Sequence, residues 1–175
     1  MELAKAYKIE TERLIIRCYH PEDAFLLKKS IDESLDHLLP WMPWAGNEPV
    51  SIEKKIDRLR KYRGQFDLGE DYVFGIFNKN EDKLIGSTGL HTRAGEHARE
   101  IGYWIHVNEI QKGYALEAAG ALTKVGFEIE GLERIEIHCT PANIRSQNIP
   151  RKLGYVNEGT LRNRATDAQK NKPLT

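Results

Sequence analysis

The feature that most constrains the fold is a strand, a helix and a second strand that follow one another between residues 98 and 140. "AREIGYWIHV" (98–107) and "LERIEIHCT" (132–140) both have the composition and alternation of strands. The chain between them predicts a helix of about fifteen residues, from its apolar spacing. A strand–helix–strand unit of this kind forms a crossover, so we expect the two strands to be parallel.

The predicted helix has one apolar face, which we expect to pack on the sheet. The residues of this face are spaced three or four positions apart. They are Ala115, Ala118, Ala119, Leu122, Val125 and Ile129.

The remaining segments predict an antiparallel meander before the crossover and a short helix and strand after it. The expected strands are 12–19, 72–78, 83–92 and 155–164, and the expected helices are 21–35, 51–65 and 142–155. Three prolines within 38–49 exclude regular structure there. The predicted fold class is therefore α+β: a mixed, mostly antiparallel sheet with a central β–α–β unit, flanked by helices.

Composition narrows the classes of function. The 26 basic and 26 acidic residues give a formal net charge of zero, whereas a general nucleic-acid binder needs a basic surplus. No apolar run approaches the ~20 residues of a membrane span, and the N-terminus lacks the apolar core of a signal peptide. Cys18, Cys139 and the six histidines have no metal-binding or redox spacing. We expect a single cytoplasmic domain over 1–175 with no metal and with neither nucleic acid nor membrane as a direct partner.

The start of the central helix, "QKGYAL" (111–116), has little side-chain bulk around Gly113. One interpretation is close packing of the helix on the sheet. The other is a phosphate site, because the unpaired amides of a first helical turn bind anions. Gly113 would leave the approach open, and Lys112 would add a positive charge.

Several motifs taken together resemble one family. They are "EIGYWI" followed by "KGYALEA", and "NIRS" followed by "KLGY" and "EGTLR". From "ETERLIIR" to "LGYVNEGTLRNR" the chain resembles the GCN5-related N-acetyltransferases (GNAT), in their RimJ/RimL-type branch that modifies ribosomal protein N-termini. The resemblance implies the GNAT-type acyl-CoA N-acyltransferase fold. It also implies acetyl-CoA as donor and direct attack by a primary amine in a ternary complex.

The resemblance also implies which residues bind acetyl-CoA. The backbone of Ile105, His106 and Val107 is expected to bond the pantetheine arm, and so is Asn143. Main-chain amides at the loop and helix start are expected to hold the pyrophosphate; these residues are Gln111, Lys112, Gly113, Tyr114, Ala115 and Leu116.

The chain departs from the family pattern at three positions. Ile110 stands at the usually polar first position of the phosphate loop. Pro150 stands where many members have a tyrosine that acts as an acid, and Ala165 stands where RimL-like enzymes have a glutamate proposed as the base. Pro150 also lacks the N–H that would bond the Ser146 carbonyl.

Amine acetylation needs a proton acceptor for the amine and a proton donor for the departing thiolate. Glu100 is the candidate base, with a salt bridge to Arg99 or Arg134 as the structural alternative. Ser146 is the candidate acid, through its match to a serine proposed for this role in RimL-like enzymes. A plain first-turn helix serine is the alternative.

Other residues have simpler interpretations. Trp41 and Trp44 either wall the acceptor pocket or form an aromatic lid on the core. His106 and His138 are expected to be structural, and Cys139 to be a buried small residue.

The polar tail "ATDAQKNKPLT" stands where the family has its last apolar strand. Either the sequence is truncated, or the sheet has an open edge that a partner chain could cover, as in a homodimer. The expected acceptor is a protein N-terminal α-amine. The alternatives are a small amine (a polyamine, amino acid or antibiotic) and a non-catalytic coenzyme A-binding module.

Overall fold

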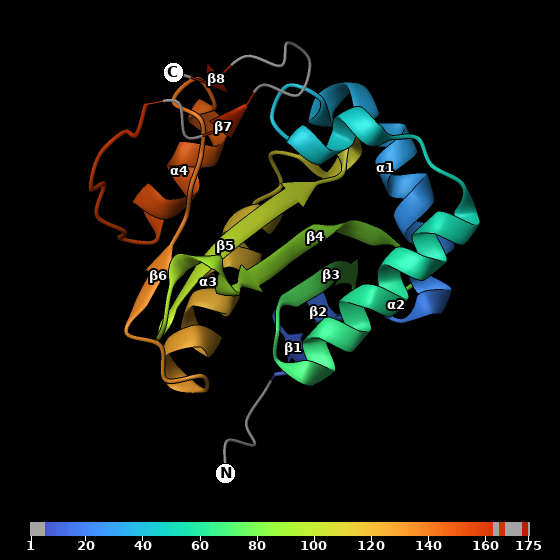
Figure 1. The fold of residues 1–175 in the computed structure, drawn as a ribbon, viewed down its shortest axis with the longest axis horizontal. Coiled ribbons are helices and arrows are strands. Elements are labelled where there is room, and N and C mark those ends of the chain that lie inside the picture. The colour runs from blue at the N-terminus through green and yellow to red at the C-terminus, as the bar shows by residue number, and fades with distance from the viewer. Residues whose placement is uncertain (1–5, 163–164, 167–172, 175) are drawn as a thin grey trace.

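The computed structural model describes residues 6–162, 165–166 and 173–174 (Figure 1). In chain order the elements are β1 (Lys8–Glu10), β2 (Leu14–Cys18), η1 (Pro21–Asp23), α1 (Ala24–Leu38), η2 (Pro43–Asn47), α2 (Ile52–Leu68), β3 (Tyr72–Asn78), β4 (Leu84–His91), η3 (Thr92–Ala94), β5 (Ala98–Ile105), η4 (Val107–Glu109), α3 (Tyr114–Glu128), β6 (Arg134–Glu136), α4 (Ile144–Lys152), β7 (Ala165–Thr166) and β8 (Pro173–Leu174). None of the helices in the described ranges is long and apolar enough to cross a membrane.

The main sheet has six strands in the order β1-β2-β3-β4-β5-β6. Neighbouring strands are antiparallel except for β5 and β6, which are parallel. Helix α3 connects that parallel pair, so the crossover predicted from the sequence is confirmed. The α+β class with a mostly antiparallel sheet is confirmed as well.

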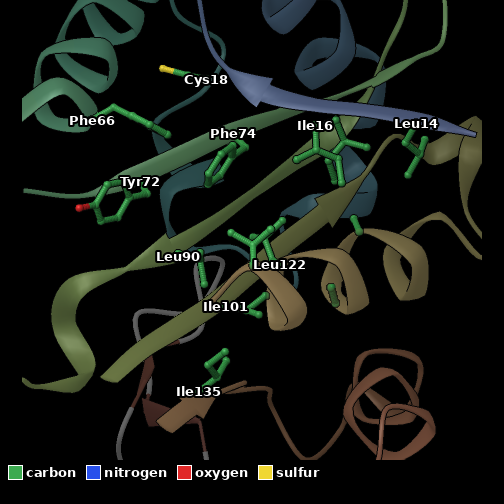
Figure 2. Packing of buried hydrophobic residues seen from close by; sticks show 14 of the residues in the cluster. Leu14, Ile16, Cys18, Phe66, Tyr72, Phe74, Leu90, Ile101, Leu122 and Ile135 are labelled. Carbon is green, nitrogen blue, oxygen red and sulfur yellow. The ribbon is translucent and has the colours of Figure 1, made fainter. Parts of the chain in front are cut away.

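Helices cover both faces of the sheet (Figure 1). Along β2, Leu14 and Ile16 point to the face where Leu122 of α3 packs, as Figure 2 shows. Ile15 points to the opposite face, where Leu27 of α1 lies in the second apolar cluster. We call these two sides the α3 face and the α1 face. Burial of each large aliphatic side chain contributes about 1.5–3 kcal/mol.

Helix α3 shows how closely the apolar pattern is followed. Ala118, Ala119, Leu122 and Val125 are buried against the sheet, as expected. Ile129 is an exception, with 46% of its surface exposed. It is the C-cap residue, beyond the last helical turn at Glu128, so it no longer follows the helix face.

The predictions after the crossover need correction. β6 covers only Arg134–Glu136, although 132–140 was expected to be strand, because β6 stops pairing with β5 after Glu136. The strand expected over 155–164 is wrong for 155–162, which are not in a strand, and residues 163–164 lie outside the described residues. Conversely, β1 is a short strand that the sequence did not indicate.

Residues 38–49 are indeed interrupted by prolines, but they contain the 3-10 helix η2, and the Glu48–Pro49 peptide bond is cis. Ser51 caps α2, as expected, through its side chain and the Lys54 amide. Glu48 is held by Lys55 and Arg58 of α2, with both nitrogens 2.7 Å from Glu48 Oε1. This cluster fixes η2 against α2.

Candidate functional site

The site is centred on the place where β5 and β6 stop pairing. Their last matched pair is Glu100 and Glu136, while β5 continues to Ile105. The His106 amide bonds the Ile85 carbonyl on the β4 side, so by alternation the backbone groups of Tyr103 and Ile105 point away from β4. No strand of the described ranges pairs with β5 on that side beyond Glu100. The amide and carbonyl groups of these two residues are therefore available to a ligand.

The start of α3 has the geometry of an anion site. Gly113 is the N-cap, with φ 84°, and the preceding Gln111 also has a positive φ, 64°. The Gly113 carbonyl accepts from the Glu117 amide at 3.0 Å, the first bond of the helix. The amides of Tyr114, Ala115 and Leu116 therefore precede the intrahelical bonds and carry the positive end of the helix dipole.

Arg13, at the start of β2, braces this loop and was not singled out from the sequence. Its Nη1 donates to the Lys112 carbonyl at 2.8 Å, and its Nε donates to Glu117 at 2.7 Å. The guanidinium lies 4.7 Å from the centre of the Tyr114 ring. Arg13 and Lys112 are 99 positions apart, so no local pattern could have joined them.

The buried carboxylate of Glu109 also anchors this loop, through Lys112. Glu109 accepts from Lys112 Nζ at 2.9 Å and from Lys83 Nζ. Burial raises the pKa of Glu109, but the bonds and charges of the two lysines outweigh this and lower it overall. Glu109 is therefore ionised at neutral pH, and it holds the Lys112 side chain against the protein.

The α3 face of β5 meets the start of α4. Asn143 is the N-cap of α4, and its Oδ1 accepts from the Ser146 amide at 3.1 Å. The Asn143 side-chain NH₂ group remains a possible donor to a ligand. The Tyr103 hydroxyl donates to the Ser146 carbonyl at 3.0 Å and lies 3.1 Å from Ser146 Oγ. Tyr103 thus supplies the donor that Pro150 cannot give to that carbonyl.

The raised pKa values of Cys139 and Tyr103 on this face argue against a cysteine nucleophile. Burial raises the pKa of Cys139, and its hydrogen bond with Ser146 only partly offsets this. Burial also raises the pKa of Tyr103 to about 12, despite the bond with Ser146. Both groups are protonated at neutral pH, and a protonated thiol is a poor nucleophile.

Glu100 lies on the α1 face of β5 and is buried. Its two oxygens accept from Arg93 Nε at 2.6 Å and from Nη2 at 2.7 Å. Burial raises the pKa of Glu100, but the bonds and charge of Arg93, with the charges of His138 and His91, lower it overall. The partners suggested from the sequence, Arg99 and Arg134, were wrong.

On the α1 face of β5, Gly102 leaves room between Glu100 and Trp104 for the His91 ring of β4, whose Nε2 would lie 3.4 Å from a Cβ at Gly102. Trp44 of η2 packs near Trp104, with ring centres 6.1 Å apart. The structure therefore brings Trp44 to the same face as Glu100. Trp41, the other tryptophan expected there, is half-buried and is not among the residues that pack on this apolar cluster.

His106 and Val107 use their amides within the protein. The Val107 amide donates to Ser34 Oγ at 3.0 Å, and the His106 amide donates to Ile85. The buried His106 ring accepts from the Asn108 amide and lies 2.9 Å from Glu33, as expected for a structural histidine. The His106 carbonyl accepts from the Glu109 amide at 2.8 Å, so of these two residues only the Val107 carbonyl remains for the expected ligand contact. Tyr103 and Ile105 therefore offer the better backbone edge.

Two further expectations fall elsewhere in the chain. Ala165 lies in β7, whose backbone pairs with β8, and its side chain lies outside the described residues. Within the described ranges, no group of three or more His, Cys, Asp or Glu residues is arranged to hold a metal ion.

Comparison with known proteins identifies the family. A family model described as an acetyltransferase (GNAT) domain matches residues 13–156. The Bacillus subtilis (strain 168) protein named "Uncharacterized N-acetyltransferase YnaD" is 41% identical over 152 residues, covering 86% of this chain and 84% of that protein. The "[Ribosomal protein uS5]-alanine N-acetyltransferase" of Escherichia coli (strain K12) is 27% identical over 157 residues, covering 87% of this chain and 79% of that protein.

Solved structures agree with this assignment. A GNAT-family acetyltransferase from Bacillus anthracis superposes with a TM-score of 0.71 at 29% identity, covering 87% of this chain and 85% of that chain. The microcin C7 self-immunity acetyltransferase MccE, crystallised with acetyl-CoA and AMP, has a TM-score of 0.86 at 17% identity, covering 98% and 93%. The latter shares the fold.

The family expected from the motifs is confirmed by these matches, which include the residues at the β5–β6 junction and at the start of α3. The chain belongs to the GNAT acetyltransferases and is an N-acetyltransferase that uses acetyl-CoA as its acetyl donor.

Proposed function

We propose that the chain acetylates the N-terminal α-amine of a protein. The observation that carries this proposal is the pairing of Glu100 with Arg93, which lowers the pKa of that carboxyl. A weakly basic carboxylate gives little help to a lysine amine, whose reference pKa is ~10.4. An α-amine, at ~7.7–8.0, is already partly neutral at pH 7 and needs less help. The uS5-alanine acetyltransferase among the relatives agrees with such an acceptor.

We further propose that acetyl-CoA lies along the unpaired edge of β5. In this arrangement the amides of residues 111–116 hold the pyrophosphate, and Asn143 with the backbone of Tyr103 and Ile105 holds the pantetheine arm. The carbonyl of Val107 extends this edge, whereas that of His106 is already bonded to the Glu109 amide. The unobstructed turn at Gly113 then serves phosphate approach.

The amine reaches the thioester from the α1 face, past Trp44, with Trp41 as a more distant part of the wall. Glu100 attracts the ammonium to the thioester, and Ser146 donates a hydrogen bond to the departing sulfur. The amine nitrogen forms a bond to the carbonyl carbon, and the carbon–sulfur bond breaks. The raised pKa of Cys139 favours this direct attack over an acyl-cysteine intermediate.

The test is a panel of acceptors assayed with acetyl-CoA, with released thiol and product mass as readouts. It contains peptides with free alanine, serine or methionine N-termini, the same peptides with a capped N-terminus and one internal lysine, and spermidine. We expect kcat/KM at least about tenfold higher for free N-termini. Faster acetylation of the capped lysine peptides or of spermidine would contradict the α-amine proposal.

A further inference from the structure

His138 lies just past the end of β6, near Glu100, whose direct partners in the sheet are His91 on β4 and Glu136 on β6. Its Nε2 lies 2.7 Å from Glu136 Oε2, and its Nδ1 lies 3.6 Å from Glu100 Oε2. The side chain is 44% exposed, so its ring is accessible to an incoming molecule. Cys139, the next residue, interacts with Ser146, which bonds Tyr103 on the α3 face. The segment therefore presents His138 toward Glu100 and Cys139 toward Ser146.

The contact with Glu136 determines which nitrogen of His138 is free. An ionised carboxylate can only accept, so in the neutral ring the proton lies on Nε2 and points to Glu136. The pKa of Glu136 is lowered, chiefly by its bond to Arg134 and then by its bond to His138, so Glu136 is ionised at neutral pH. Nδ1 then carries a lone pair directed to the Glu100 side. A base oriented in this way by a carboxylate is a recurrent catalytic arrangement.

Glu100 alone is a poor acceptor for the proton of the amine. Both of its oxygens already accept from Arg93, and a proton there would compete with those two bonds. Imidazole is the side chain that most often serves as a proton acceptor in enzymes. A proton acceptor is most effective when its pKa is near the operating pH.

We infer that His138 is a catalytic residue whose Nδ1 takes the proton released by the acceptor amine. As nitrogen attacks the thioester carbonyl, its proton passes to Nδ1, directly or through one water. The thiolate leaves with the electron pair of the carbon–sulfur bond and takes its proton from solvent with the help of Ser146. The imidazolium is stabilised by Glu100 on one side and Glu136 on the other, and it returns its proton to solvent.

The charges around His138 come from every neighbouring element. They are Glu100 on β5, Glu136 and Arg134 on β6, Arg93 on η3, and His91 on β4, which pairs with Asp71 at 3.0 Å. Arg93 and Arg134 each bond one of the two flanking carboxylates. Each carboxylate thus faces an arginine on one side and His138 on the other.

The inference rests on acetyl transfer to an amine but not on the α-amine preference, so it is tested with whichever acceptor of the panel turns over fastest. His138→Gln is compared with His97→Asn, a matched change at a histidine before β5 whose side chain is 66% exposed and lies 3.8 Å from Glu96. Asparagine tolerates the positive φ of His97. We expect His138→Gln to lower kcat about 100-fold at pH 7 and to remove the acid limb of its pH profile. Acetyl-CoA affinity, measured by calorimetry, should be unchanged.

A chemical rescue separates a proton acceptor from a structural side chain. In His138→Ala, added imidazole should restore at least about a tenth of the wild-type kcat, while imidazole should leave Glu100→Gln unchanged. A His138→Gln enzyme within twofold of His97→Asn overturns the inference. So does a parallel loss of acetyl-CoA affinity. A preference for lysine or spermidine in the panel contradicts the proposed α-amine acceptor and leaves this experiment fully informative.

Discussion

Pro150 leaves the carbonyl of Ser146 without the donor that a helix would normally provide four residues later. Tyr103 fills that role from β5, at 3.0 Å. Tyr103→Phe removes this donor while preserving the ring, so the carbonyl loses its partner in a half-buried position. We expect the free energy of unfolding, measured in urea, to fall by about 1–2 kcal/mol.

The matched control is the same change in a Pro150→Ala background. Alanine at 150 restores an N–H that can bond the Ser146 carbonyl, so Tyr103→Phe should cost about 1 kcal/mol less there. Strictly additive costs in the two backgrounds would show that Tyr103 stabilises the protein by packing alone.

At the scale of elements, the start of α3 is the part of the proposed donor site most dependent on backbone conformation. Gly113→Val forces a branched side chain into φ 84° at the proposed pyrophosphate loop, with its Cβ 3.3 Å from Nη2 of Arg13, which braces that loop. We expect acetyl-CoA affinity, measured by calorimetry, to fall at least about tenfold.

Gly131→Val is the control for backbone strain. Gly131 also has a positive φ, 64°, and nothing lies within 4 Å of a Cβ built there. Gly113→Val should lose more unfolding free energy than Gly131→Val, because its Cβ also meets Arg13, and only Gly113→Val should lose affinity. Equal affinity in the two variants would remove the phosphate assignment from this turn.

The same elements show what the sequence could predict. The crossover was accessible because the apolar spacing of α3 and the alternation of β5 are local patterns. The end of β6 was not, since the alternating apolar pattern continues through "IEIHC" and only the divergence from β5 stops the pairing. Similarly, 155–162 alternate enough to suggest a strand, yet no strand among the described residues pairs with them.

The candidate site divides in the same way. A glycine before a helix predicts a phosphate loop from local chemistry, and the family motifs predict Asn143 and Ser146. The hydrogen bonds that hold the site together join residues from different segments. They are Arg13 with Lys112, Arg93 with Glu100, and Tyr103 with Ser146. Such contacts depend on how the elements pack, which a single sequence does not encode in any short pattern.

For the molecule as a whole, the buried Glu48 cluster links stability to pH. Burial raises the pKa of Glu48, but the hydrogen bonds and charges of Lys55 and Arg58 lower it overall. A depressed folded-state pKa contributes stability above the unfolded value of ~4.3, and this is lost as pH falls through the folded pKa. Glu48→Gln should therefore cost about 3–5 kcal/mol at pH 7, because Lys55 is left buried without its partner.

The pH dependence supplies the sharper readout of this prediction. Between pH 5 and 3, urea unfolding of Glu48→Gln should depend on pH less steeply than that of the wild type. Glu96→Gln, at a side chain that is 91% exposed, should retain the wild-type slope. An unaltered slope in Glu48→Gln would show that other carboxylates dominate acid unfolding.

The alternation of side chains along β5 divides the proposed work of the enzyme between its two faces. Tyr103 lies on the side of α4, where the coenzyme is proposed to bind, whereas Glu100, Gly102 and Trp104 lie on the side from which the amine is proposed to arrive. With this arrangement, acceptor specificity can change without a change in coenzyme binding. We expect replacements at even-numbered positions to change amine recognition, while the odd-numbered positions keep the proposed coenzyme contacts that every acceptor shares.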